Sequence, residues 1–312
     1  MKPINVCVIG IGNLGQHHAR NYSTMPGVNL TGVVDVNPKR LEKIASQFKT
    51  NAFSDYKEAI KNADAVSIVV PTSMHYEIGK EVIMAGKHCL IEKPFTTSVE
   101  HAEELIHLAQ KQGTVLQIGH IERFNGAILA LQKYIDQPKF IETDRLGPYD
   151  PRVSDVGVVL DLMIHDLDIV PFLVGSKVKD VEAYGTRIFS KHEDIAKIRL
   201  RFHNGCVADL TASRVTMGKY RKLRIFQSTA YISVDYPTQR FRIYTKKKPQ
   251  VESLKDIEIT SPKVERIEPL KKELEHFIEC VREDKKPLVT GEYGKDALVL
   301  ALEVLNKIHL HT

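Results

Sequence analysis

The sequence predicts an α/β fold of two domains: a doubly wound parallel sheet in residues 1–120, and an α+β domain with a large, mostly antiparallel, open-faced sheet in residues 121–312. Short apolar runs alternate with helical segments as far as Gly119, which is typical of βαβ units. After Gly119, strand-like segments follow one another without helices between them. The length of 312 residues is ordinary for two domains that each bury a core.

The strands expected in the first domain are INVCVIG, LTGVVD, AVSIVV, HCLIE and VLQIG. They are continuously apolar, as strands are when helices cover both faces of a parallel sheet. Residues 38–48, 74–85 and 98–112 have helical periodicity and supply those helices.

The second domain is expected to begin with a helix at roughly 122–136, followed by a buried helix at 156–173. Its strand-like segments are VEAYGTRIF, IAKIRLRF, CVADLTASR, KLRIFQS, YISVDY and FRIYTK. Several of them alternate apolar and charged residues, which predicts a sheet with one face in water or against a partner. Helices at about 269–283 and 292–309 close the chain.

Composition excludes several classes of protein. The net charge of +5 is mild, and the densest basic run, Lys246–Lys248, suits a solvated turn, so no nucleic-acid partner is expected. No stretch approaches the ~18 apolar residues of a membrane span, and no leader is expected before the first strand. The four cysteines are far apart, which favours buried free thiols and a cytoplasmic location.

A glycine-rich turn follows the first strand: Gly10-Ile11-Gly12-Asn13-Leu14-Gly15. Its glycines allow a tight turn, close approach of a pyrophosphate and close packing of the next helix, whose N-terminus faces the phosphates. Asp35 ends the next strand 20 residues after Gly15, where an acid binds the ribose hydroxyls of a dinucleotide. The pattern predicts a Rossmann domain; the alternative is a glycine turn with an acidic helix cap.

Asp35 also predicts the cofactor. A carboxylate repels a 2′-phosphate by ~4 kcal/mol per unit charge at 4 Å and an effective dielectric constant near 20. NAD is therefore expected in preference to NADP, although Lys39 and Arg40 soften that preference.

Two groups of residues can carry chemistry. Glu92 ends the strand HCLIE and Lys93 follows it, at the sheet edge where open parallel sheets bind ligands, and a lysine there can stabilise an alkoxide. Asp161 and His165 are four residues apart on a predicted helix, so a carboxylate can orient an imidazole that acts as a general base. The alternatives are a surface lysine and an interdomain salt bridge. No metal site is predicted, since no third ligand has suitable spacing.

These motifs, with VPTSMH and the closing PLKKELEHFIECV and VTGEYGKDAL segments, resemble the glucose–fructose oxidoreductase/inositol dehydrogenase family (Gfo/Idh/MocA) over essentially the whole chain. The resemblance implies that Lys93, Asp161 and His165 are catalytic. It also implies that Pro71, Thr72 and His75 line the adenosine ribose and nicotinamide. The glycines common before and within the family's D-x-x-x-H helix are replaced here by Val158-Val159-Leu160 and Met163.

That variant, VVLDLMIHDLD, together with GHIERFN, is similar to family members that act on UDP-N-acetylglucosamine and oxidise its C3 hydroxyl, which leads to 3-amino sugars. Arg123 and Asn125 at the domain junction, and Arg145, Tyr149 and Arg152 in an expected Pro/Gly-containing loop, are candidates to contact the diphosphate and uracil. For each arginine the alternative is a surface ion pair.

The resemblance therefore implies an NAD-dependent nucleotide-sugar dehydrogenase whose site is assembled by closure of a hinge near residue 120. The alternatives are a dehydrogenase of a free sugar or inositol, and a non-catalytic dinucleotide-sensing regulator. A homo-oligomer, a dimer or tetramer, is expected through the open face of the second sheet, where an uncovered apolar patch is predicted. The Lys93–Pro94 bond is expected to be cis.

Overall fold

The computed structural model describes residues 2–150 and 156–311. The chain forms two compact units. The first contains the residues up to Ile121 together with Glu268–Leu298, and the second contains Glu122–Ile267 together with the residues from Val299 onward. Within the described part of the chain, no helix is long and apolar enough to cross a membrane. All four cysteines are buried free thiols, as predicted.

The first unit has a six-stranded sheet in the order β3-β2-β1-β4-β5-β6, and every neighbouring pair is parallel. This confirms the predicted doubly wound sheet. Its strands are β1 (Ile4–Ile9), β2 (Val28–Val34), β3 (Asn51–Phe53), β4 (Ala65–Ile68), β5 (His88–Glu92) and β6 (Leu116–Gly119). Strand β3 was not predicted, because three residues are too few to show a pattern.

Helices follow the strands. They are α1 (Gly15–Thr24), α2 (Pro38–Phe48), α3 (Tyr56–Ile60), α4 (His75–Met84) and α5 (Val99–Gln112). Of these, α2, α3 and α5 begin at side-chain caps. Asn37 caps α2 by accepting from the backbone N–H of Arg40, and Ser98 caps α5 in the same way. Gly113 then ends α5 in the left-handed conformation that glycine adopts readily.

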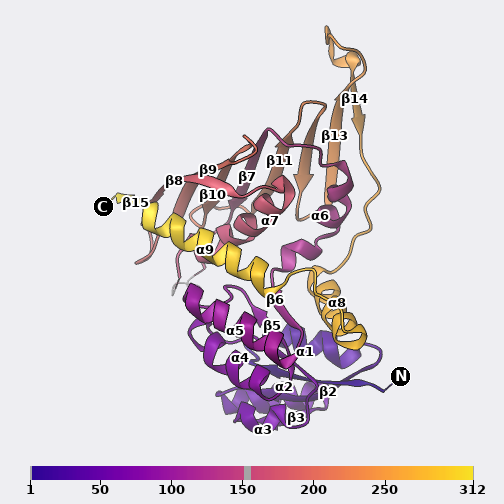
Figure 1. Cartoon of the computed structure of the whole chain (residues 1–312), viewed down its shortest axis with the longest axis vertical. Coiled ribbons are helices and arrows are strands. Elements are labelled where there is room, and N and C mark those ends of the chain that lie inside the picture. The colour runs from indigo at the N-terminus through magenta and orange to yellow at the C-terminus, as the bar shows by residue number, and fades with distance from the viewer. Residues whose placement is uncertain (1, 151–155, 312) are drawn as a thin grey trace. The chain divides into compact units, whose positions relative to one another are not determined.

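Helix α8 (Pro269–Glu283) belongs to the first unit, which corrects the predicted division of the chain at residue 120. Its residues Leu270, Leu274 and Phe277 are buried in one core with β1 and α1. Figure 1 shows α8 beside α1. The apolar stripe of α8 predicts that it packs on a core, but it does not say which of the two cores.

One buried residue of α8 should make stability depend on pH. Glu273 is fully buried, and neither carboxylate oxygen has a hydrogen-bond partner among the described residues. Burial, and next the Glu92 carboxylate, raise the pKa of Glu273 well above its usual value. Folding therefore takes up a proton. The stability from this group is fully present below the unfolded-state pKa of about 4.3 and is lost as pH rises toward the folded-state pKa.

Glu273→Gln is expected to flatten that pH dependence, because an amide does not ionise. Urea unfolding of the variant at pH 5 and pH 8 should give free energies that differ less than those of the wild type. Glu275→Gln, in a half-exposed position of the same helix, should leave the difference unchanged. Equal pH dependence in wild type and Glu273→Gln would contradict the assignment.

The second unit has a nine-stranded sheet in the order β14-β13-β12-β11-β7-β10-β9-β8-β15. Most neighbours are antiparallel, as predicted; β10 with β7 and β15 with β8 are parallel. The strands are β7 (Phe140–Leu146), β8 (Val178–Thr186), β9 (Ile195–Phe202), β10 (Val207–Ser213), β11 (Tyr220–Phe226), β12 (Ala230–Asp235), β13 (Arg240–Lys246), β14 (Ile257–Thr260) and β15 (His309–His311).

Helices cover one face of this sheet. In Figure 1, α6 (Gly126–Leu131), α7 (Ile164–Val174) and the second half of α9 (Gly291–Lys307) lie on that side, and their apolar residues share one core with the sheet. The helix predicted at 122–136 is shorter and flanked by 3₁₀ turns, because Asn125 caps a new helix at Gly126.

The other face of the sheet is charged along β9, so the predicted apolar patch covers only part of this face. Ile198, Leu200 and Phe202 are buried in the core, so the alternate positions of β9 point away from it and carry Lys197, Arg199 and Arg201. An aromatic row crosses one end of this face, with ring centroids 4.9–5.7 Å apart. The row consists of Phe140, Phe226, Tyr231 and Tyr244.

Candidate active site

The glycine-rich turn after β1 has the close contacts that a dinucleotide loop requires. A Cβ on Gly10, whose φ is +84°, would lie 2.3 Å from the carbonyl oxygen of Val69. A Cβ on Gly15 would lie 1.9 Å from the carbonyl oxygen of Gly10, so α1 can approach the turn only at a glycine. At Gly12 the nearest atom would be 3.9 Å away, which leaves the backbone open to a ligand. The loop therefore fits a pyrophosphate.

Asp35 lies just after β2 and is buried. Its Oδ2 accepts from the backbone N–H of Ile11 at 3.1 Å and from Arg40 at 3.2 Å, and its Oδ1 accepts from the N–H of Asn37 at 2.8 Å. The carboxylate is thus fixed beside the glycine-rich turn, with Arg40 balancing part of its charge. Asn13 and Leu14, at the tip of the turn, are exposed.

Asp35→Asn is expected to raise the ratio of kcat/KM for NADP to that for NAD by at least about tenfold. The substitution removes the charge that repels a 2′-phosphate, and 1.4 kcal/mol corresponds to tenfold. Asp64→Asn is the matched control, because Asp64 accepts a backbone N–H at the opposite edge of the same sheet. An unchanged cofactor ratio in Asp35→Asn would contradict the role of Asp35.

Glu92 is the last residue of β5, and Lys93 follows it at the carboxyl edge of the sheet. Lys93 is half-buried, whereas Glu92 and Pro94 are buried. The Lys93–Pro94 peptide bond is cis, as predicted. A partly accessible lysine therefore lies at the end of β5, at the same carboxyl edge of the sheet as the glycine-rich turn.

The residues after β4 differ in exposure. Pro71 is exposed and Thr72 is half-buried, so both are accessible to a ligand. His75 is buried, and its ring nitrogens lie 2.9 Å from the carbonyl oxygens of Pro94 and Val70. Burial lowers the pKa of His75, and these carbonyl groups partly offset that effect. His75 thus links the segment after β4, at Val70, to the segment after β5, at Pro94.

Asp161 lies in a π-helical segment, Val159–Met163, that leads directly into α7. The D-x-x-x-H segment is helical, as predicted. Its first turn is a π-helical turn, which is wider than an α-helical one and is common at functional sites. Asp161 and His165 are both half-buried, in contrast to their mostly buried neighbours. Both side chains are thus accessible at the edge of an apolar core.

The start of this helix is held by Glu193, which the sequence analysis missed. Its Oε1 accepts from the backbone N–H of Val159 at 3.1 Å. A Cβ on Gly157 would lie 1.9 Å from the same oxygen, so this glycine keeps the space for the carboxylate. The contact joins positions 34 residues apart, and no local pattern signals it.

Arg123 and Arg145 are almost fully buried and each forms a two-pronged pair with an acid of α7. Arg123 donates to both oxygens of Asp168 at 2.6 and 2.8 Å. Arg145 donates to both oxygens of Asp166 at 2.9 and 3.0 Å. Burial opposes the charge of Arg145, but the carboxylates of Asp166 and Glu122 outweigh it and raise its pKa well above the usual value.

Arg145 was expected in a loop, but it lies in β7, where buried polar residues conceal the alternation of the strand. Asn125 is buried and caps α6. To contact a substrate directly, these side chains would have to exchange their present partners. Tyr149 is half-buried beside Phe189, and Arg152 lies outside the described residues.

Arg221 on β11 is a cation that the sequence analysis missed. It lies opposite Arg145 in the sheet register, and its side chain is 38% exposed. Its guanidinium lies 3.7 Å from the carboxylate of Glu122, and the carboxylate of Asp161 also acts on its charge. Burial, and next Arg145, lower the pKa of Arg221. In the sequence Arg221 is one of several basic residues of this strand, and no local pattern separates it from those that lie on the surface.

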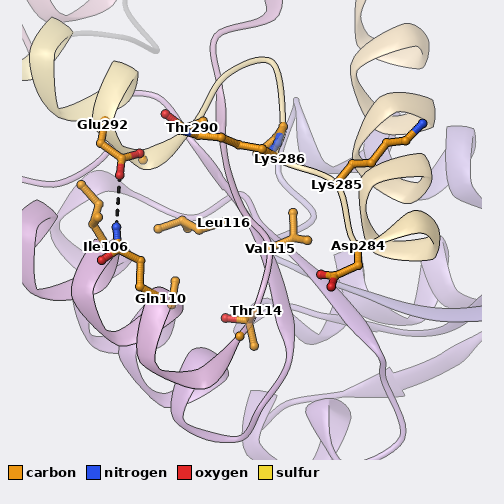
Figure 2. Close-up of a pocket in the computed structure, with 14 residues that line it drawn as sticks. Ile106, Gln110, Thr114, Val115, Leu116, Asp284, Lys285, Lys286, Thr290 and Glu292 are labelled. Atoms are coloured by element: carbon orange, nitrogen blue, oxygen red, sulfur yellow. Dashed lines mark hydrogen bonds between the residues drawn. The ribbon is translucent and has the colours of Figure 1, made fainter.

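A separate pocket of about 300 Å³ lies at the amino end of β6, at the opposite edge of the sheet from the glycine-rich turn. Figure 2 shows Gln110 donating to Glu292 across it, with Lys285 and Lys286 at its rim. It contains none of the predicted site residues.

Comparison with known proteins places these features in a family. The model of an oxidoreductase family with an NAD-binding Rossmann fold, GFO_IDH_MocA, matches residues 4–120. The model of the GFO/IDH/MocA C-terminal domain matches residues 125–247.

Individual relatives match along nearly the whole chain. UDP-N-acetylglucosamine 3-dehydrogenase of Acidithiobacillus ferrooxidans is 37% identical over 298 residues, or 95% of each protein. A solved structure of that enzyme aligns with a TM-score of 0.94 at 36% identity, covering 99% of this chain and 98% of the other. The scyllo-inositol 2-dehydrogenase (NAD(+)) of Bacillus subtilis is 27% identical over 308 residues, covering 92% of this chain and 89% of that enzyme.

Proposed function

The chain belongs to the Gfo/Idh/MocA family of oxidoreductases, and on that premise we propose that it oxidises the C3 hydroxyl of UDP-N-acetylglucosamine to a ketone with NAD. The substrate assignment rests on the 37% identity, along 95% of the chain, with an enzyme named for this reaction. Inositol is the second candidate substrate, supported by inositol dehydrogenases at 27% identity.

In this proposal the chain moves one proton. His165, oriented by Asp161, removes the proton of the C3 hydroxyl group. Lys93 donates a hydrogen bond to the same oxygen and stabilises its developing negative charge. Bound NAD would supply the hydride acceptor, so that the C–H bond and the O–H bond of the substrate give NADH, a proton and the 3-keto sugar. The half-buried state of the three side chains supports these roles.

The cofactor would be held by the residues around the glycine-rich turn. The turn Gly10–Gly15 would hold the pyrophosphate and Asp35 the adenosine ribose, with Pro71 and Thr72 at the rim. The space over Gly12 supports this placement.

For the diphosphate and uracil of the substrate we propose Arg221 together with Tyr149 and Arg152. Arg221 is preferred to Arg123 and Arg145 as a substrate contact because it is more exposed. The guanidinium groups of Arg123 and Arg145 are paired with carboxylates. Asn125 would then act by fixing the start of α6.

The product suits an aminotransferase, because a 3-keto sugar is the substrate that such an enzyme converts to a 3-amino sugar. We propose that this product feeds the synthesis of a cell-surface glycolipid, such as lipopolysaccharide, or of a polysaccharide. A cytoplasmic location is supported by four buried free thiols, which suit a reducing compartment.

We also propose that the open face of the second sheet binds another copy of this chain. The aromatic row and the paired charges Arg199–Asp209 and Arg201–Glu182 support a self-complementary surface. Light scattering at micromolar concentration should give a multiple of the 35.3 kDa chain mass, and Tyr231→Glu should lower that mass. A wild-type monomer would contradict this.

Steady-state assays of NADH formation test the function. UDP-N-acetylglucosamine should reduce NAD with a higher kcat/KM than scyllo-inositol, myo-inositol or free N-acetylglucosamine. Activity with inositol alone would refute the nucleotide sugar and retain the dehydrogenase. Cofactor binding without turnover on any of these substrates would favour a dinucleotide-sensing regulator.

A further inference from the structure

We propose that His18 is a positioning residue for Lys93 and acts through the carboxylate of Glu92. The inference rests on the function proposed above for Lys93. It adds a residue of α1 that belongs to none of the predicted site motifs and is 74 positions from its partner.

The Glu92 carboxylate bridges α1 to the peptide group of Lys93. Its Oε1 lies 3.2 Å from Nε2 of His18, and its Oε2 accepts from the backbone N–H of Lys93 at 3.3 Å. The side chain of His18 is fully buried and that of Glu92 is 8% exposed. Among the residues that the structure describes, His18 is the side chain that forms a hydrogen bond with this carboxylate. The orientation of Glu92, and with it the acceptor for the Lys93 N–H, therefore depends on His18.

The neighbouring strand is shaped around the same carboxylate. A Cβ on Gly119, at the end of β6, would lie 2.7 Å from the carboxyl carbon and from one oxygen of Glu92. The carboxylate is thus packed directly on the β6 backbone, between that strand and α1. A side chain at position 119 would expel it.

The chain after Lys93 is fixed by a second buried imidazole. Nδ1 of His75 lies 2.9 Å from the carbonyl oxygen of Pro94, while Nε2 lies 2.9 Å from that of Val70. Lys93 therefore stands between two fixed points, Glu92 with His18 before it and Pro94 with His75 after it. Such a framework can hold an ammonium group in one place relative to the glycine-rich turn.

An apolar side chain in place of His18 would fill the space but leave the Glu92 carboxylate without its partner. The carboxylate would then turn or recruit water, and the Lys93 backbone would lose its acceptor. A displacement of about 1 Å at a reacting group can lower turnover by about 10²-fold. Because His18 has no exposed surface, it cannot contact the substrate itself, and its bond to Glu92 links it to the peptide group of Lys93.

The test compares His18→Leu with His18→Gln. The amide nitrogen of glutamine is as many bonds from Cα as Nε2 of histidine, so glutamine can still donate to Glu92. Tyr22→Phe is the matched control: Tyr22 lies one turn further along α1 and is also buried, and it bonds Ser67 at 2.9 Å instead of Glu92.

His18→Leu is expected to lower kcat by about 10- to 100-fold with the dissociation constant of NAD, measured by fluorescence titration, changed less than threefold. His18→Gln should recover most of that loss. Tyr22→Phe should keep wild-type kcat even if thermal unfolding shows a lower midpoint. Should His18→Leu fail to fold, His18→Asn takes its place, because the amide nitrogen of asparagine is one bond closer to Cα than Nε2 of histidine and falls short of Glu92; the loss is then expected in His18→Asn and not in His18→Gln.

Lys93→Met, measured in parallel, separates the two proposals. His18→Leu should add no further loss of activity in a Lys93→Met background, because both act at one group. If Lys93→Met remains active, the function proposed for Lys93 fails. If Lys93→Met is inactive but His18→Leu matches Tyr22→Phe, or His18→Gln is no better than His18→Leu, only the role of His18 is refuted.

Discussion

Lys93→Met is expected to lower turnover by about 10²- to 10⁴-fold while leaving NAD binding nearly unchanged. The substitution keeps the length of the side chain but removes the positive charge and the donor that stabilise a developing alkoxide. Lys93 lies at the carboxyl edge of β5, where open parallel sheets bind ligands, and it is half-buried, so its side chain is partly shielded from water. Steady-state kinetics with NAD and UDP-N-acetylglucosamine give kcat, and fluorescence titration gives the dissociation constant of NAD.

Lys87→Met is the matched control, because Lys87 precedes the same strand at its opposite end. Its turnover should equal that of the wild type. His165→Ala is expected to fall in the same range as Lys93→Met, since it removes the proposed base. A Lys93→Met variant that retains more than a tenth of wild-type turnover would contradict the role of this lysine.

Gly15→Ala is expected to reduce both stability and cofactor affinity, whereas Gly12→Ala should reduce affinity alone. A Cβ at position 15 would lie 1.9 Å from the carbonyl oxygen of Gly10, so the turn and α1 must separate. Overpacking of this kind lowers the free energy of unfolding by about 1–3 kcal/mol. At position 12 the nearest atom is an Arg40 nitrogen 3.9 Å away, so the unliganded fold accommodates the methyl group.

That methyl group would occupy the space through which the backbone approaches the pyrophosphate. The loss of one or two hydrogen bonds to a charged phosphate, at about 1.5 kcal/mol each, corresponds to a loss in NAD affinity of about tenfold to a hundredfold. Urea unfolding and calorimetric titration with NAD measure the two quantities. Wild-type NAD affinity in Gly12→Ala, or wild-type stability in Gly15→Ala, would contradict the fit of this loop to a dinucleotide.

Features that depend on residues close together in the sequence could be predicted from it. The glycine spacing, the acid at Asp35 and the periodicity of α2, α4 and α5 each arise within about 20 residues, so one local pattern specifies the fold there. The parallel sheet followed for the same reason, because each strand and its helix form a local unit.

Features that depend on distant partners were not predictable. Helix α8 is amphipathic in either unit, and only packing shows that Leu274 and Phe277 join the first core. Arg145 was expected in a loop, because its buried pairing with Asp166 makes a strand residue resemble a surface one. The open sheet face was expected to carry a large apolar patch, but along β9 the apolar positions are the ones buried in the core.

The candidate site divides in the same way. Lys93, Asp161 and His165 were found from motifs, and all three are accessible in the structure. The residues that hold their segments, Glu193 and His18, act through contacts that span 34 and 74 positions, and neither lies in a recognisable motif.

Oxidation at C3 of UDP-N-acetylglucosamine can be followed directly through the hydrogen that leaves the sugar. The enzyme would be incubated with NAD and UDP-N-acetylglucosamine carrying deuterium only at C3, and the reduced cofactor analysed by mass spectrometry. We predict one deuterium in each NADH formed, together with a 3-keto sugar. NADH without deuterium would contradict the account, because the hydride would then have come from another carbon.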